Sequence, residues 1–144
     1  MAMITGDTSV TREFTGNWKA VTEERVFAFS GGFPDDPGWP KKNIHTDLEF
    51  ARSCGLPTRA ASGAMFEGYL AELMTELFGE QWLRGGTMTL SFIATVDCGD
   101  RLLPHAVVRS KEPNGSVVRF TVDVWCENQH GTKVVVGTAQ GSIE

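Results

Sequence analysis

One histidine in this sequence stands where an irregular segment gives way to a predicted helix. In "PKKNIHTDLEFA", residues 40–51, His45 follows a stretch rich in Gly and Pro and precedes Asp47 by two residues. An imidazole titrates near neutral pH and is the most common general acid or base in enzymes. A side chain at the start of a helix can also project into a cleft. Two interpretations of His45 stay open, packing at the helix start and acid–base chemistry.

The carboxylates near this histidine are equally ambiguous. Asp47 falls in a predicted first helical turn, where it would complement the helix dipole by about 0.3–1 kcal/mol without any catalytic purpose. Asp35 and Asp36 lie between two prolines and fit the composition of a turn. Either aspartate would form an acid–base pair with His45 if the loop brought it within reach.

The two remaining histidines have simpler interpretations. His130 precedes Gly131 in a predicted hairpin turn and is expected to be solvated. His105 follows Pro104 in the middle of a predicted strand. A partly buried histidine with a hydrogen-bond partner is the favoured interpretation there.

A second possible site element is the start of the long apolar stretch in "ASGAM". Ser62 is the natural N-cap, and Gly63 would begin the helix with free backbone N–H groups. Such an end can hold an oxyanion or polarise a carbonyl. The sequence lacks G-x-S-x-G, a phosphate-binding loop, a dinucleotide fingerprint and a metal-ligand cluster, so a nucleophilic Ser62 is unsupported and no metal or redox cofactor is expected.

The helix that must position this start is the clearest in the chain. "ASGAMFEGYLAELMTELFG" has apolar residues at steps of three and four, with Gly79 as the natural stop. Its apolar band is wide, so we expect the helix to be largely enclosed. A shorter helix is predicted from Thr22 to Gly31, and another after a capping box formed by Thr46 and Glu49.

The second half of the chain changes to a period of two. "TMTLSFIATV", "RLLPHAVVRSKE", "SVVRFTVDVWCEN" and "TKVVVGTAQGSI" read as four strands separated by the turns "DCGD", "EPNG" and "NQHG". Four hairpin-connected strands after one enclosed helix indicate an antiparallel sheet curling around that helix. The predicted fold class is α+β, the shape called a hotdog.

Length and composition limit the possible functions. The 144 residues predict one domain, residues 1–144, with residues 1–15 loosely ordered. A formal net charge of -5 argues against a nucleic-acid partner. Cys54, Cys98 and Cys126 have no metal or disulfide spacing, and no signal core or membrane-length apolar run is visible, so a cytoplasmic protein without membrane attachment is expected.

The order of four segments resembles the MaoC-like family of (R)-specific enoyl-CoA hydratases and dehydratases. They are "FAFSGG", "NIHTDLEFA", "ASGAMFEGYLAEL" and "LSFIATVDCGDRL", and the resemblance covers roughly residues 20–142. It implies the hotdog fold, an acyl thioester of coenzyme A or a carrier protein as substrate, and a homodimer with the acyl tunnel at the junction of two sheets.

The resemblance also implies roles for particular residues. His45 would activate water or protonate carbon, and the Gly63 N–H would polarise the thioester carbonyl. The family's aspartate lies five residues before its histidine, where this chain has Pro40, and Gly32 takes its place if the loop is lengthened after it. Asp36 is therefore the expected partner of His45. The residues expected to contact the substrate are Phe33, Trp39, Asn43 and Ser62.

Two alternatives to a hydratase or dehydratase remain. Loss of the usual aspartate is compatible with a hotdog thioesterase or a specialised enzyme acting on a polyketide-like or aromatic intermediate. A non-catalytic hotdog subunit that binds an acyl group or completes a heterodimer would need "NIHTD" only as the start of a helix.

Overall fold

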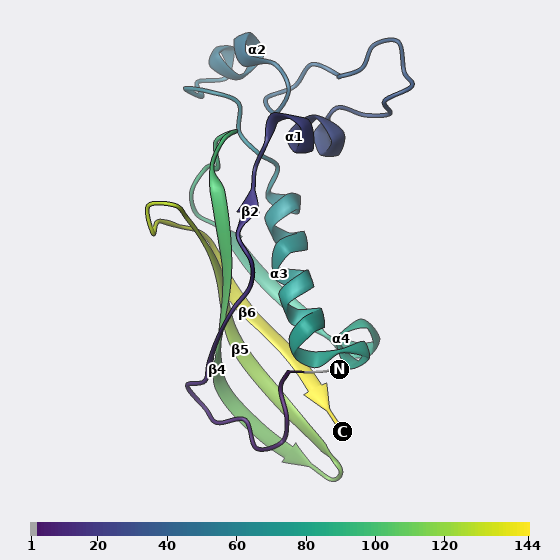
Figure 1. Cartoon of the computed structure of the whole chain (residues 1–144), viewed down its shortest axis with the longest axis vertical. Helices are drawn as coiled ribbons and strands as arrows, with labels where there is room; N and C mark the ends of the chain where they lie inside the picture. Colours follow the sequence, from purple (N-terminus) through teal and green to yellow (C-terminus); the bar gives the residue numbers. More distant parts are fainter. Residues whose placement is uncertain (1–2) are drawn as a thin grey trace.

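The long apolar helix and the strands that follow it form one packed unit. In the computed structural model, which describes residues 3–144, helix α3 (Gly63–Phe78) lies against one face of a curved six-stranded antiparallel sheet (Figure 1). The sheet order is β1-β4-β5-β6-β3, with β2 also paired to β4. The α+β class predicted from the sequence is confirmed. The strands are β1 (Glu13–Thr15), β2 (Lys19–Ala20), β3 (Thr87–Phe92), β4 (Arg101–Asn114), β5 (Val117–Asn128) and β6 (Lys133–Ile143).

Helix α3 is enclosed because its apolar band covers most of its circumference. Its buried side chains are Met65, Phe66, Leu70, Leu73, Met74, Leu77 and Phe78. Gly79 ends the helix with a φ of 64°, as its position in the sequence predicts. Burial of this many large apolar side chains is the main stabilising contribution to the fold, at roughly 1.5–3 kcal/mol for each.

The sheet presents alternate residues of each strand to this helix. In β5, Phe120, Val122, Val124 and Cys126 are buried while the residues between them are less so. The helix approaches the sheet closely at β6, where a Cβ on Gly141 would lie 2.8 Å from the Phe78 ring. A larger residue at position 141 would therefore push the end of α3 away from the sheet.

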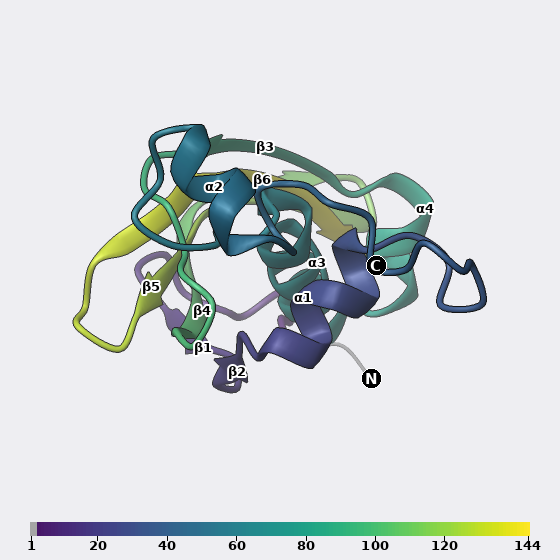
Figure 2. The same cartoon turned by 90° about the horizontal axis from the view of Figure 1, so that it is seen from above.

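Two shorter helices lie beyond the N-terminal end of α3. They are α1 (Glu23–Ser30) and α2 (Leu48–Ser53), joined by a long loop (Figures 1 and 2). Thr22 caps α1 as predicted, because its side chain accepts a hydrogen bond from the Arg25 N–H. A further helix, α4 (Glu80–Gly85), follows α3 directly. No helix within residues 3–144 is both long enough and apolar enough to cross a membrane.

The predicted cap of α2 is wrong by one residue. Asp47, not Thr46, is the N-cap, and its Oδ1 accepts a hydrogen bond of 2.7 Å from the Phe50 N–H. Thr46 is buried, and its hydroxyl donates to the Lys41 carbonyl instead. Because the Thr46 hydroxyl is used in the preceding loop, the next residue with a side-chain acceptor, Asp47, caps the helix.

The N-terminal segment also differs from the expectation of loose order. Residues 1 and 2 lie outside the described residues, but Ile4 is only 2% exposed and its N–H donates to the Leu77 carbonyl at 2.9 Å. Farther along, β1 pairs with β4 from Glu13 to Thr15. One buried isoleucine and a short strand hold a segment whose composition is otherwise polar.

The buried thiol of Cys126 predicts a loss of stability in alkali. Burial raises the pKa of Cys126 from 9.0 to about 12. Above pH 9 the unfolded chain loses this proton while the folded chain keeps it, so the free energy of unfolding falls by about 1.4 kcal/mol per pH unit. Urea denaturation at pH 8 and pH 10 would measure this decrease.

Two cysteine variants provide the comparison. Cys126→Ala removes the ionising group and should have a smaller alkaline loss than the parent protein. Cys54→Ala removes an exposed thiol and should leave the loss unchanged. Equal alkaline losses in the two variants would contradict the assignment to Cys126.

Candidate active site

His45 and Gly63 line the same pocket. The pocket has a volume of about 570 Å³ and lies where the segment before α2, the start of α3 and the chain leaving β3 meet. Its larger apolar lining residues are Ile44, Leu56, Phe66, Phe92, Ile93 and Val96. The structure thus brings together the two residues that the sequence singled out from segments 18 positions apart.

The His45 ring is fixed by a backbone carbonyl. Its Nδ1 lies 2.6 Å from the carbonyl oxygen of Ala60, and the Ala60 N–H donates to the Ile44 carbonyl at 3.2 Å. A carbonyl only accepts, so Nδ1 must carry the hydrogen. In the neutral ring the lone pair is therefore on Nε2, which is the nitrogen able to take up a proton.

Ala60, whose carbonyl orients the ring, lies in a segment that pairs with the chain following β3. Ala60 forms an isolated antiparallel bridge with Asp97, and the Ala61 N–H donates to the Val96 carbonyl at 2.7 Å. This short pairing joins the approach to α3 with the chain that follows β3. The orientation of His45 therefore depends on both segments.

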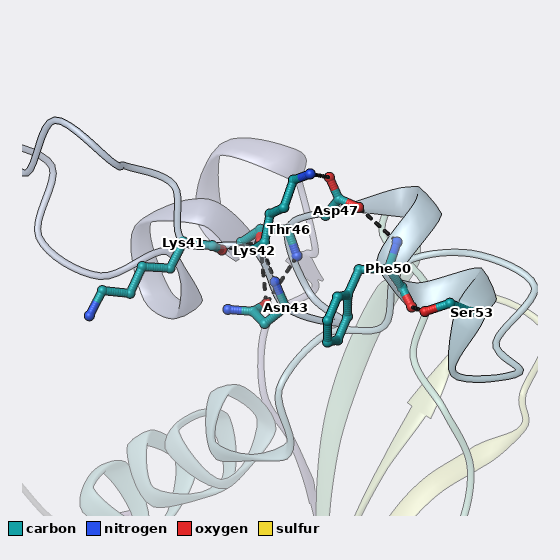
Figure 3. A network of polar contacts seen from close by, with 7 residues as sticks. All are labelled: Lys41, Lys42, Asn43, Thr46, Asp47, Phe50 and Ser53. Carbon is teal, nitrogen blue, oxygen red and sulfur yellow. Dashed lines mark hydrogen bonds and ion pairs between the residues drawn. The ribbon is translucent and has the colours of Figure 1, made fainter.

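Asn43 organises the turn that carries His45. Its Oδ1 accepts hydrogen bonds from the N–H groups of His45 at 2.9 Å and Thr46 at 3.2 Å, and its Nδ2 donates to the Ser30 carbonyl at 2.8 Å. Figure 3 shows Asn43 and Thr46 inside the polar network that leads into α2. The sequence predicted a substrate contact for Asn43, but the structure uses both ends of its amide to connect α1 to this turn.

Gly63 is the first residue of α3, and its surroundings admit no side chain. A Cβ there would lie 2.8 Å from Cε1 of Phe92, whose ring stacks edge-to-face with Phe66 at 5.8 Å between centroids. Ser62 occupies the N-cap position but makes no side-chain capping bond and does not line the pocket. No acceptor within residues 3–144 takes the Gly63 N–H, which leaves it available at the positive end of the helix dipole.

The structure does not bring Asp36 to His45. Asp36 is exposed, and its Oδ1 accepts a hydrogen bond of 3.0 Å from the Gly38 N–H within its own turn. Asp35 is also exposed, and Asp47 caps α2. Each of the three carboxylates therefore has the structural position that its local sequence favours, and none lines the pocket.

The two aromatic residues expected in the pocket lie elsewhere. Phe33 is 82% exposed on the loop between α1 and α2. Trp39 packs edge-to-face on Phe27 of α1, with 6.2 Å between the ring centroids. The aromatic wall of the pocket is instead formed by Phe66 and Phe92, which sequence analysis assigned only to a helix and a strand.

The other two histidines follow their predicted environments. His130 is exposed in the turn between β5 and β6. His105 is partly buried, its ring stacks on Trp125 at 4.9 Å, and its Nδ1 lies 3.3 Å from Thr15 Oγ1. Its Nε2 is 3.1 Å from Glu127 Oε1 but outside hydrogen-bonding geometry, so this contact is an ion pair only when the ring is protonated.

The electrostatics of the pocket are simple. His45 is the only titratable side chain among its lining residues, and Thr95 provides the one other polar side chain there. Asp97, just beyond lining residue Val96, has its pKa raised by burial and, to a lesser extent, by Asp100. Within residues 3–144 no group of three or more His, Cys, Asp or Glu side chains is placed to hold a metal ion.

Comparison with known proteins identifies the fold. No protein-family model matches the chain, and no curated protein matches it. Among solved structures it is similar to a MaoC-like dehydratase from Rhodospirillum rubrum, with 24% identity and a TM-score of 0.75 over 95% of this chain and 93% of that one.

Two further solved structures share this architecture. The (R)-hydratase from A. caviae involved in PHA biosynthesis has 22% identity and a TM-score of 0.68, covering 95% of this chain and 98% of that one. The C-terminally truncated HadBC complex of Mycobacterium tuberculosis, a 3R-hydroxyacyl-ACP dehydratase, has 15% identity and a TM-score of 0.65, covering 93% and 96%. The chain therefore has the hotdog fold found in MaoC-like dehydratases and (R)-hydratases, as predicted.

The position of Asn43 predicts a structural cost for its removal. Asn43→Ala leaves the His45 N–H and the Ser30 carbonyl without their partners, while the Thr46 N–H keeps only its 3.3 Å bond to the backbone carbonyl of residue 43. The free energy of unfolding should fall by about 1–3 kcal/mol. Amide exchange at His45 and Thr46 should accelerate. The matched control is Asp36→Asn, which keeps the acceptor for the Gly38 N–H and should change neither quantity. Unchanged exchange at His45 in Asn43→Ala would contradict the positioning function.

Proposed function

We propose that this protein is a MaoC-like hydratase or dehydratase acting on an enoyl or 3-hydroxyacyl thioester of coenzyme A or a carrier protein. The observation that supports this most directly is the shared pocket of His45 and the free N–H of Gly63. An acid–base group and an anion-stabilising donor beside an apolar cavity are what the addition of water to an enoyl thioester requires.

The proposed reaction uses both groups in one cycle. His45 Nε2 takes a proton from a water molecule, whose oxygen bonds to the β-carbon of the enoyl group. The electrons of the C=C bond move onto the thioester oxygen, where the Gly63 N–H stabilises the negative charge. The imidazolium then returns its proton to the α-carbon, and dehydration is the same sequence in reverse. An oxyanion donor of this kind contributes about 10²–10³-fold to the rate.

The rest of the pocket favours an apolar acyl group. Phe66, Phe92 and Ile93 offer hydrophobic contact, and no charged side chain other than a protonated His45 lines the cavity. The A. caviae relative is an (R)-hydratase, and the HadBC complex acts on 3R-hydroxyacyl-ACP. The first name supports hydration or its reverse, and the second supports an acyl thioester substrate for this chain.

We further propose a homodimer formed at the β3 edge. In the part of the chain that the structure describes, β3 ends the sheet and pairs only with β6, so its outer edge has unpaired backbone groups. Phe92 and Ile93 are 50% and 57% exposed at this edge and also line the pocket. A second copy at β3 would cover these side chains and close the cavity beside them.

One observation supports an alternative function. No carboxylate of residues 3–144 lines the pocket, whereas the family resemblance implies an aspartate beside the histidine. A hotdog thioesterase or a specialised enzyme would fit that difference, and a non-catalytic acyl-binding subunit would fit it as well. Release of free thiol from acyl-CoA would support the thioesterase, and binding without turnover would support the subunit.

His45 is the first residue to test. His45→Ala should abolish hydration of crotonyl-CoA, followed as loss of enoyl absorbance, because the only acid–base group of the pocket is removed; a decrease of about 10²–10⁴-fold is expected. Circular dichroism should show an intact fold. His130→Ala, at an exposed turn, is the control and should keep full activity. Unchanged hydration by His45→Ala would reject the assignment.

The Gly63 N–H is tested by comparing two substitutions. Gly63→Ala keeps the N–H but adds a Cβ against Phe92. Gly63→Pro adds the same Cβ together with two further ring carbons and removes the N–H. Proline is well tolerated at the first helical position, and Ser62 already has the extended backbone that precedes proline, with φ -68° and ψ 135°. We expect kcat for crotonyl-CoA to fall about 10²-fold further in Gly63→Pro than in Gly63→Ala. Equal losses would show that bulk alone matters.

A further inference from the structure

The proton chemistry of the pocket depends on a single side chain. The Asp36 side chain accepts a hydrogen bond from the Gly38 N–H, and the Asp47 side chain accepts one from the Phe50 N–H. Neither aspartate lines the cavity. Of the side chains lining the pocket within residues 3–144, His45 alone carries an acid–base group. In hydration, His45 would have to activate a water molecule and then protonate carbon. A reaction that only moves a proton between two carbons needs the same imidazole but no water molecule positioned beside it.

The ring is held in a way that suits such a transfer. The hydrogen bond from Nδ1 to the Ala60 carbonyl fixes the ring and leaves Nε2 as the only position that exchanges protons with a substrate. One nitrogen in a fixed orientation serves two carbons of an acyl chain when both present the same face to it. C2 and C4 of a 3-enoyl thioester are related in this way, since the conjugated dienolate formed by loss of a C2 proton holds C1 to C4 in one plane.

The remaining lining supports the same chemistry. Removing a proton from C2 places negative charge on the thioester oxygen, which the free N–H of Gly63 is able to stabilise. Phe66, Phe92 and Ile93 make the wall apolar, and Thr95 is the only other polar side chain along it. Within residues 3–144 the wall carries no second acid–base side chain that could take the proton from Nε2, so this proton can return to the substrate.

We propose that this site also isomerises 3-enoyl thioesters to 2-enoyl thioesters, with His45 as the only acid–base group. His45 Nε2 takes a proton from C2, and the electrons of that C–H bond form the C2–C1 double bond as the carbonyl becomes an enolate. The enolate electrons then reform the carbonyl, the C1–C2 bond electrons move to C2–C3, and the C3–C4 double bond takes the proton from the imidazolium at C4. No water, oxidant or second base is consumed. This inference rests on the proposed acyl-thioester site.

The test uses 3-hexenoyl-CoA carrying deuterium at both C2 positions, in ordinary water. Conversion is followed by the absorbance of the conjugated thioester, and mass spectrometry and NMR locate the deuterium in the product. A single base carries deuterium from C2 to C4, whereas two separate groups would place a solvent proton at C4. We expect a measurable fraction of the product from early turnover to carry deuterium at C4.

The diagnostic variant is His45→Asn. The asparagine amide can still donate to the Ala60 carbonyl from the position of Nδ1, so the turn is retained while Nε2 is lost. Isomerisation should fall at least about 100-fold. Asp36→Asn is the control and should isomerise at the parent rate. Thermal unfolding of both variants reports whether they fold, and Gly63→Pro, which acts at a different residue, should also slow isomerisation.

Hydration of crotonyl-CoA, measured on the same preparation, separates this inference from the proposed function. Isomerisation with deuterium at C4 supports the inference whether or not hydration occurs, and its occurrence without hydration would reject only the hydratase. Hydration without isomerisation would overturn the inference and leave the hydratase standing. Isomerisation without deuterium at C4, or unchanged in His45→Asn, would overturn the single-base assignment. Absence of both reactions would reject both proposals.

Discussion

The hydrogen bond between His45 Nδ1 and the Ala60 carbonyl is the interaction on which the site depends. It joins the turn before α2 to the segment that leads into α3, and it decides which ring nitrogen carries the lone pair. In many enzymes a carboxylate orients the histidine and stabilises its protonated form. Here a neutral backbone carbonyl orients the ring and provides no full negative charge.

The burial of α3 determines where the second half of the site lies. Leu70, Met74 and Leu77 are fully enclosed by the sheet, so the helix has no freedom to slide or rotate without losing that packing. Its first residue, Gly63, is thereby held beside Phe92 at the end of β3. Stability and site geometry have the same origin here, since the contacts that fold the domain also place Gly63 at the pocket that His45 lines.

The loop between α1 and α2 shows that the type of a residue and its position in the folded chain can indicate different environments for its side chain. In its acidic turn, the Asp36 side chain accepts a hydrogen bond from the Gly38 N–H. Of its two aromatic residues, Phe33 is exposed to solvent and Trp39 packs on Phe27 of α1. The family resemblance implied that Asp36, Phe33 and Trp39 all serve the pocket. Asn43 shows the opposite case, because a side chain expected to meet substrate holds the turn that presents His45.

The sequence by itself determined the enclosed helix ending at Gly79, the four long strands and their turns, because the 3.6- and two-residue periods and glycine stops are properties of adjacent residues. It also singled out His45 and Gly63, which line one pocket in the structure. Only the tertiary structure decided that Ala60 orients the imidazole, that Phe66 and Phe92 form the wall and that Asp36 lies outside the pocket. Those outcomes depend on contacts between distant segments, which no local pattern encodes, and the Ala60 contact uses a backbone carbonyl that every residue type possesses.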